Sequence, residues 1–300
     1  TYDTDSLRVL ANAPNISTDA LYTNSTIALN ADNGELVWHY QHMRNDQLDH
    51  DWAFERQIIN LPVNGEMRKT IVTGGKEAIF EALDAATGDY LFSIDLDMQN
   101  VITEIDSRTG AKTLNPAAIP EPGQVLAGLS MNGICPDALG ARNMQSPSYN
   151  PNSGILYIPM QDTCVNNLTG KRWQKYPNPE ENGLWGMVKA VDLKTREVLW
   201  TTRQFAPPAS GNLTTDGGLL FTGSIDRWFK AVDQRSGEIL WQQRLDNSPS
   251  SYPITYRVDG KQFVAIATNS GSFYANGMER TAGITNPPTG ASLWVFALPD

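Results

Sequence analysis

The sequence predicts an all-β fold of the β-propeller type. Three observations support this: an internal repeat, the spacing between its copies, and short strand-like runs that separate them. Segments with the periodicity of an amphipathic helix are few. The 300 residues can bury a sizeable core, and an apolar content of 40% is ordinary for a globular protein. We therefore expect the repeated unit to be a small antiparallel sheet.

Each copy of the repeat reads as a strand end, a polar turn and a second strand that ends on a large aromatic residue. The copies span residues 28–38, 82–92, 190–200 and 231–241. Gly34, Gly88 and Gly237 close the turn in their copies, whereas Arg196 stands at this position in the remaining one. An Asp or Asn side chain can accept hydrogen bonds from turn amides, and glycine readily adopts the positive φ of a tight turn. We therefore expect a β-hairpin at each copy.

The spacing of the copies is that of propeller blades. They begin 54, 108 and 41 residues apart, and residues 151–157 supply a degenerate hairpin inside the long interval. Repeats of about 40–50 residues are typical of blades. Strand-like runs at 69–73, 218–223 and 262–267 and a terminal strand at 292–297 bring the total to about five blade-like units. Because a propeller closes on itself, we expect residues 1–300 to form one partial propeller domain within a larger ring.

Composition excludes several classes of function. A formal charge of −10 disfavours nucleic acid and anionic membranes as partners and is compatible with binding cations. No run approaches the ~18 apolar residues of a membrane helix, so we expect no membrane segment in this chain. Cys135 and Cys164 form neither a CxxC nor a CxxCH motif, which excludes a zinc ribbon and a c-type haem attachment. A disulfide in an oxidising compartment and two free buried thiols both remain open.

One segment, residues 39–56, concentrates chemistry, and we call it the acidic loop. It holds all three histidines and four carboxylates. If the segment is extended, Asp49, Asp51 and Glu55 could converge on a hard cation such as calcium. The alternative is a solvated acidic loop. Zinc is disfavoured because His39 and His42 would lie on opposite faces of a strand, so we expect packing or surface roles for them.

Three other segments are candidates for ligand contacts. In residues 73–77, which we call the glycine turn, two glycines precede Lys76 and could let the backbone approach a ligand while the ammonium reaches an anionic or carbonyl oxygen. The P-loop pattern is missing, and a solvent-facing lysine on a β-turn is the alternative. Asn143 lies in a Gly/Asn/Pro-rich stretch that predicts a structured loop. Trp228 could serve blade packing or line a cofactor pocket.

Taken together, these segments resemble the pyrroloquinoline quinone (PQQ)-dependent alcohol dehydrogenases, relatives of bacterial methanol and ethanol dehydrogenases. The resemblance covers nearly the whole chain and implies the later blades of an eight-bladed quinoprotein propeller. The tryptophan-bearing repeats resemble the docking motifs that tie each blade to the next. The family's Asp-x-Trp-Asp-x-Asp loop corresponds to residues 46–51, with Leu48 in place of the usual Trp.

The resemblance implies a metal site and a catalytic base. Asp49 matches the base, which also contacts the metal. Asp51 matches the added carboxylate of members that use lanthanides. Asn12 is the candidate for the family's metal-binding Asn.

The resemblance also implies a quinone site. Lys76 matches the basic residue at the quinone carbonyls, and Asn143 and Trp228 match quinone-pocket contacts, although Met144 replaces a common Trp. The remaining metal and quinone ligands would belong to sequence that precedes this chain.

The implied function is oxidation of an alcohol to an aldehyde or ketone, with PQQ as hydride acceptor and a calcium or lanthanide ion as Lewis acid. Asp49 would be the general base. A periplasmic location, a periplasmic cytochrome c as electron acceptor and a homodimer are further expectations. Two alternatives are a non-catalytic propeller scaffold, which would share the repeats, and a glycoside hydrolase that uses Asp49 with Asp51 or Glu55.

Overall fold

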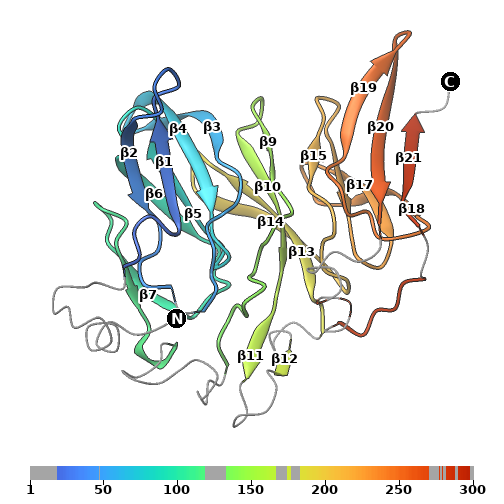
Figure 1. The fold of residues 1–300 in the computed structure, drawn as a ribbon. Coiled ribbons are helices and arrows are strands. Elements are labelled where there is room, and N and C mark those ends of the chain that lie inside the picture. The colour runs from blue at the N-terminus through green and yellow to red at the C-terminus, as the bar shows by residue number, and fades with distance from the viewer. Residues whose placement is uncertain are drawn as a thin grey trace. The chain divides into compact units, whose positions relative to one another are not determined.

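The computed structural model describes residues 19–46, 48–118, 133–166, 174–176, 183–269, 277, 279, 282–287 and 290–297. The chain folds into two compact units, of which the first contains residues 1–141 and 163–176 and the second the remainder. The described elements are almost all strands, which confirms the all-β prediction (Figure 1). Within the described ranges, no helix is long and apolar enough to cross a membrane.

The first unit is built around an antiparallel four-stranded sheet. Its strands are β3 (Gln57–Val63), β4 (Glu66–Gly74), β5 (Ile79–Asp84) and β6 (Tyr90–Asp95), in that order across the sheet. Three hairpins accompany this sheet: β1 (Ser25–Leu29) with β2 (Leu36–Gln41), β7 (Ile102–Ile105) with β8 (Lys112–Leu114), and β11 (Cys164–Asn166) with β12 (Gln174–Tyr176). A short 3₁₀-helix, η1 (Pro116–Ala118), follows β8.

The second unit contains two four-stranded sheets and one of three strands, all antiparallel. The first consists of β9 (Ser148–Asn150), β10 (Ile155–Gln161), β13 (Gly186–Asp192) and β14 (Glu197–Gln204). The second consists of β15 (Leu213–Thr214), β16 (Leu219–Gly223), β17 (Trp228–Asp233) and β18 (Ile239–Arg244). The third consists of β19 (Ile254–Val258), β20 (Lys261–Thr268) and β21 (Ser292–Ala297). Such up-and-down sheets are typical of propeller blades.

All four repeat copies form the predicted hairpins, at β1–β2, β5–β6, β13–β14 and β17–β18. In each hairpin the strand register shifts directly after the repeat's alanine. The Asp or Asn side chain accepts a hydrogen bond from the amide two residues later, as Asp84 Oδ1 does from Ala86 at 2.9 Å. The turn chemistry read from the sequence is therefore confirmed.

The spacing suggested that a degenerate hairpin forms a further blade-like unit in the long interval between the copies that begin at residues 82 and 190. The structure explains the length of this interval differently. The hairpin at residues 151–157 is not a separate unit, because β9 and β10 belong to the same sheet as β13 and β14. Much of the extra length lies in the β7–β8 and β11–β12 hairpins. The β7–β8 turn is itself an unrecognised copy, in which Asp106 Oδ1 accepts from Arg108 N at 2.9 Å and Gly110 has a φ of 70°.

In each unit, the tryptophan that ends one repeat packs against the glycine in the hairpin turn of the following repeat. A Cβ added to Gly88 would lie 2.5 Å from Trp38 Cε3, and one added to Gly237 would lie 2.8 Å from Trp200 Cε3. The indole N–H of Trp200 also donates to Gln234 O at 3.1 Å. These contacts join successive hairpins within each unit and give a packing reason for glycine at residues 88 and 237.

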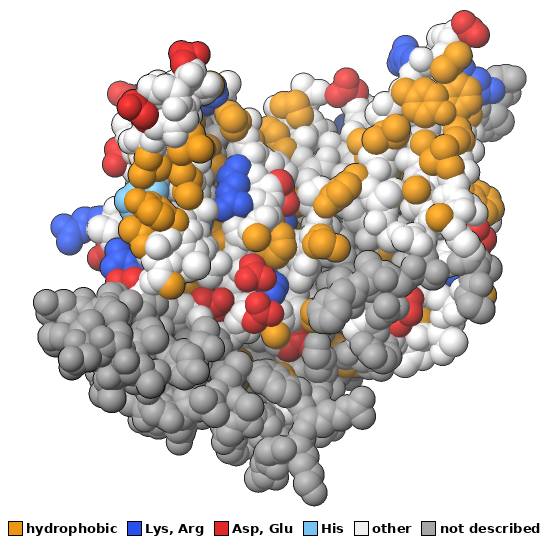
Figure 2. All heavy atoms as spheres, viewed as in Figure 1, with side chains coloured by type: hydrophobic (Ala, Val, Ile, Leu, Met, Phe, Trp, Pro, Cys, Tyr) orange, Lys and Arg blue, Asp and Glu red, His pale blue; other side chains and the backbone are white. Residues whose placement is uncertain are grey.

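Sheets in each unit present an exposed apolar face. Figure 2 shows hydrophobic side chains gathered over β19 and β20 in the second unit. Ile254, Val258 and Leu293 are all more than half exposed there. Leu29 and Val37 are similarly exposed on β1 and β2. Faces of this composition are suited to packing against a further sheet.

We predict that Gly88→Ala lowers the free energy of unfolding by about 1–3 kcal/mol more than Gly34→Ala does. Both glycines have positive φ, 76° and 74°, so each variant incurs the same backbone strain. Only at Gly88 would the new methyl group collide with Trp38, since no described atom lies within 4 Å of the corresponding point at Gly34. Denaturant titration measures both losses, and equal losses would contradict the packing role of Trp38.

Candidate active site

Asp46 holds the acidic loop in a tight turn between β2 and β3. Its carboxylate accepts hydrogen bonds from the backbone N–H groups of Leu48, at 2.9 Å, and His50, at 2.8 Å. Asn24 Nδ2 donates to Asp46 Oδ2 at 3.5 Å and to His50 O at 3.4 Å. Asp49 has a φ of 63°, a left-handed conformation that Asp tolerates. The loop is therefore not the extended segment that the carboxylate spacing suggested.

Lys76 binds this turn through its backbone and its side chain. Its N–H donates to Asp51 O at 3.1 Å, and its Nζ donates to Asp49 O at 2.6 Å. The same Nζ lies 2.7 Å from Asp51 Oδ2 and 3.5 Å from Asp49 Oδ2. The structure thus brings together three of the predicted site residues, from two segments that are far apart in the sequence.

The ammonium is buried and the carboxylates are open. The Lys76 side chain is 6% exposed, whereas those of Asp49 and Asp51 are 69% and 44% exposed. The alternative of a solvent-facing Lys76 is therefore wrong. Open carboxylates can accept a proton or coordinate a hard cation, and the ammonium places a fixed positive charge beside them. The arrangement can serve a substrate or cofactor that carries oxygen atoms.

The described carboxylates do not by themselves make a complete set of metal ligands. Among the described residues, no three His, Cys, Asp or Glu side chains are grouped so as to hold a metal ion. The prediction that Glu55 converges with Asp49 and Asp51 is therefore wrong, because the loop turns at Asp49. Asn12 lies outside the described residues. Since calcium takes about 6–8 oxygen ligands, further ligands would have to complete the coordination.

The two remaining predicted site residues belong to the second unit. Asn143 is half-buried, and its Oδ1 accepts a hydrogen bond from Met144 N at 2.9 Å. Trp228 begins β17 and is half-buried, with Arg244 Cζ 5.9 Å from the centre of its ring. Their assignment to a quinone pocket remains a prediction.

The glycines before Lys76 make room for the protein's own side chains. A Cβ on Gly75 would collide with Glu77 Oε2 and with the indole of Trp52. The sequence offers these glycines as a place where the backbone could approach a ligand closely. The structure shows instead that Gly75 lets Trp52, the residue after Asp51, pack directly against the glycine turn.

Glu77 is buried among these groups. Its side chain is fully buried, and in the described part of the chain neither carboxylate oxygen has a hydrogen-bond partner. Burial raises the pKa of Glu77 to about 8. The residue is therefore mostly protonated at neutral pH and adds little charge beneath the loop.

His50 ties the loop to a disulfide-bonded segment. Its side chain is fully buried, and Nε2 lies 3.3 Å from Pro136 O. Pro136 follows Cys135, which forms a disulfide with Cys164. Of the two states left open for these cysteines, the structure therefore shows the bonded one. Burial lowers the pKa of His50, so the ring is neutral as it donates to this carbonyl.

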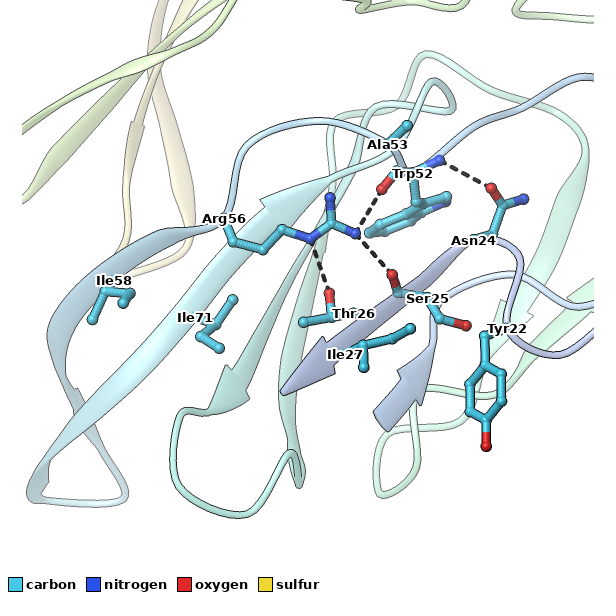
Figure 3. Close-up of a pocket in the computed structure, with 10 residues that line it drawn as sticks. All are labelled: Tyr22, Asn24, Ser25, Thr26, Ile27, Trp52, Ala53, Arg56, Ile58 and Ile71. Atoms are coloured by element: carbon cyan, nitrogen blue, oxygen red, sulfur yellow. Dashed lines mark hydrogen bonds between the residues drawn. The ribbon is translucent and has the colours of Figure 1, made fainter. Parts of the chain in front are cut away.

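Within the acidic loop, the backbone of Trp52 is held on both sides by hydrogen bonds, as Figure 3 shows. Trp52 N donates to Asn24 Oδ1 at 3.1 Å, and its carbonyl accepts from Arg56 Nη2 at 2.7 Å. Arg56 also donates to Ser25 O and to Thr26 Oγ1, each at 3.1 Å. These residues line a pocket of about 530 Å³. The guanidinium of Arg56, which lines this pocket, donates its hydrogen bonds to oxygens of the protein itself.

Sequence reasoning missed the residues that shape the site. Asp46 stood in the family motif without a role, although an Asp followed by turn residues is a known signal for backbone capping. No sequence pattern pointed to Asn24 or Arg56, because most of their hydrogen-bond partners are backbone atoms that carry no mark in the sequence.

Comparison with known proteins identifies the family. The protein family described as "PQQ: Glucose/ethanol/alcohol dehydrogenase, beta-propeller domain" matches residues 14–104 and 159–264 of the chain. The chain belongs to this family. Its sheets are therefore blades of a β-propeller, and the resemblance seen in the sequence is confirmed.

Curated relatives and solved structures agree with this assignment. The chain is 30% identical to the dehydrogenase subunit of alcohol dehydrogenase (quinone) from Komagataeibacter europaeus, over 89% of this chain and 39% of that protein. It is 28% identical to the quinoprotein alcohol dehydrogenase PedH from Pseudomonas putida, over 94% of this chain and 49% of that protein. A europium-containing methanol dehydrogenase has a TM-score of 0.84 at 27% identity, over 93% of this chain and 54% of that one. The chain thus spans between two fifths and about half the length of these relatives.

We predict that Glu77→Gln raises the free energy of unfolding at pH 8 by roughly 2–4 kcal/mol and leaves it nearly unchanged at pH 4.5. The folded pKa lies above the unfolded value, so the unfolded chain releases this proton first. Wild-type stability should therefore fall as pH rises from about 4.5 to about 8.

Thermal unfolding of the variant between these pH values measures the effect. Glu104→Gln, at an exposed glutamate on β7, is the control and should change little. A pH dependence that is the same in wild type and Glu77→Gln would show that Glu77 does not titrate in this range.

Proposed function

We propose that this chain forms the part of a PQQ-dependent alcohol dehydrogenase that carries the catalytic base and a lysine for the quinone. The reaction would convert an alcohol to an aldehyde or ketone. One observation supports the proposal most strongly: the buried Lys76 ammonium contacts both open carboxylates, Asp49 and Asp51. These are the residues that the family resemblance assigned to the quinone, the base and the metal.

Each of these residues has a role that follows from its position. Asp49 has the more exposed carboxylate and is free to take the proton of a substrate hydroxyl. Lys76 fixes the backbone of Asp49 through its carbonyl and would donate to quinone oxygens from the same ammonium. When bound, PQQ would supply the hydride acceptor and the cation the Lewis acid.

The donor atoms of the site suit calcium or a lanthanide. Asp49 and Asp51 offer only hard oxygen ligands, and both are solvent-accessible. A second carboxylate raises the local negative charge, which favours a trivalent ion over a divalent one. The structural similarity to a europium-containing methanol dehydrogenase supports a lanthanide as one of the two candidates. Asn12 remains a proposed further ligand.

The disulfide and the relatives of this chain suggest a cellular location and an electron acceptor. The Cys135–Cys164 disulfide favours an oxidising compartment, and we propose the periplasm. Relatives include a 1-butanol dehydrogenase (cytochrome c) from Thauera butanivorans and a quinohemoprotein alcohol dehydrogenase from Comamonas testosteroni. We therefore propose a periplasmic cytochrome c as electron acceptor. A homodimer remains an untested expectation.

The scaffold alternative accounts less well for the site. Burial of an ammonium costs free energy that its ion pairs only partly offset, so a scaffold gains little from Lys76. The hydrolase alternative predicts activity without any redox cofactor. Both alternatives can be tested in the same experiment as the proposed function.

The test uses the complete enzyme that contains these residues, freed of metal and quinone and then reloaded. We predict that alcohol-dependent dye reduction requires PQQ together with calcium or a lanthanide, and that Asp49→Asn lowers kcat by about 10²–10⁴-fold, as expected for loss of a general base. Asp97→Asn is the matched control, because Asp97 is also exposed and has a φ of 58°.

Full activity of Asp49→Asn would contradict the assignment of the base. Quinone-free sugar release would favour the hydrolase. Failure to bind quinone after reconstitution, with no dye reduction, would favour the scaffold.

A further inference from the structure

His42, from the first part of the acidic loop, forms a buried polar group with Glu81 and Lys112, which we call the buried triad. Glu81 Oε2 lies 2.6 Å from His42 Nδ1, and Glu81 Oε1 lies 2.5 Å from Lys112 Nζ. The side chains of His42 and Glu81 are fully buried, and that of Lys112 is 3% exposed. Lys112 also donates to His42 O at 2.7 Å. The three residues come from separate segments, so their convergence is a property of the fold.

The hydrogen bonds of the triad fix the orientation of the imidazole. Burial lowers the pKa of His42, so the ring is neutral. In that state Nδ1–H donates to Glu81, and Nε2 accepts from the hydroxyl of Thr26 at 2.7 Å. Thr26 Oγ1 in turn accepts from Arg56 Nε at 3.1 Å. With both ring nitrogens bonded, the plane of the imidazole cannot rotate without breaking a hydrogen bond.

Trp52 is stacked on this fixed ring. The ring centres of His42 and Trp52 are 4.3 Å apart, and the planes differ by only 4°. Lys112 Nζ lies 5.0 Å from the centre of the Trp52 ring, a distance suited to a cation–π contact. The side chain of Trp52 also packs against Gly75. The indole therefore fills the space between the triad and the glycine turn.

The position of Trp52 bears directly on the site. Asn24 and Arg56 hold its N–H and carbonyl, as Figure 3 shows. Asp51 precedes it, and the Asp51 carbonyl accepts from Lys76 N–H. If the indole shifted and carried the Trp52 backbone with it, Asp51 would move relative to Lys76. Displacements of about 1 Å in a catalytic group can lower rates by about 10²-fold.

We propose that His42, oriented by Glu81 and Lys112, is a positioning residue that sets the plane of Trp52 and thereby places Asp51 beside Lys76. This inference rests on the proposed dehydrogenase function. It assigns His42 no contact with substrate or cofactor. It also explains why an ionic triad lies in a place where apolar packing alone would stabilise the fold at least as well.

The test compares a flat ring with a non-planar side chain at His42. His42→Phe preserves the stack, whereas His42→Leu removes it. In the loaded enzyme, we expect His42→Leu to lower kcat by about 10–100-fold with the alcohol KM changed less than about 3-fold. We expect His42→Phe, which keeps a flat ring but loses the hydrogen bonds that orient it, to lower kcat by a smaller factor of about 3–10-fold. Phe92→Leu is the control for stability, because Phe92 is a buried aromatic residue of the same unit that lies on β6, outside the acidic loop and the buried triad.

The near-ultraviolet circular dichroism of the tryptophans gives a second readout that does not depend on activity. The difference between wild type and Trp52→Phe defines the Trp52 band. We expect His42→Leu to lose this band and His42→Phe and Phe92→Leu to retain it. If His42→Leu does not fold, Trp52→Leu compared with Trp52→Phe makes the same kinetic comparison from the other ring.

Several results would overturn the inference. One is a His42→Leu enzyme that keeps kcat and the Trp52 band. Another is a kcat that falls equally in His42→Leu and His42→Phe, or in proportion to lost stability in Phe92→Leu as well. A wild-type enzyme without quinone-dependent oxidation would instead refute the proposed function, and the Trp52 band would still decide whether His42 orients Trp52.

Discussion

The buried ammonium of Lys76 is the interaction on which the site depends. It is bonded to the backbone carbonyl of Asp49 and paired with the carboxylate of Asp51, so one side chain fixes the path of the acidic loop and lies beside its open carboxylates. An ammonium loses most of its hydration when buried, and only nearby negative charge compensates for this loss. The two carboxylates therefore have to remain beside Lys76 even before any cofactor or cation binds.

The surrounding residues hold the acidic loop and Lys76 next to each other. Asp46 caps the turn that carries Asp49, and the absence of a side chain at Gly75 lets Trp52 pack against the glycine turn. Glu77 is buried in the same place, and this burial raises its pKa to about 8, so the side chain is mostly protonated at neutral pH. Polar groups are thus buried here at some cost to stability, as is common at functional sites.

The sequence predicted the hairpins and the key residues more reliably than their geometry. The repeats located four hairpins because an Asp-turn-Gly pattern is local chemistry that does not depend on the rest of the fold. The carboxylate-rich loop singled out Asp49 and Asp51, and the two glycines before a lysine singled out Lys76. The family resemblance then suggested their roles. The convergence of Glu55 was wrong because a single residue in the left-handed region turns the chain at Asp49. The buried triad could not be predicted, since Lys112 reaches Glu81 through contacts between distant segments that leave no pattern in the sequence.

The central claim is that Lys76 orders the acidic loop, and amide hydrogen exchange of residues 46–54 tests it most directly. The measurement needs neither quinone nor alcohol. In Lys76→Met, exchange in this segment should accelerate at least about 10-fold while β3–β5 remain protected, because local opening costs less free energy once these bonds are lost. Lys69→Met, at an exposed lysine on β4, should leave the loop unchanged. Unaltered protection of the loop in Lys76→Met would contradict the account.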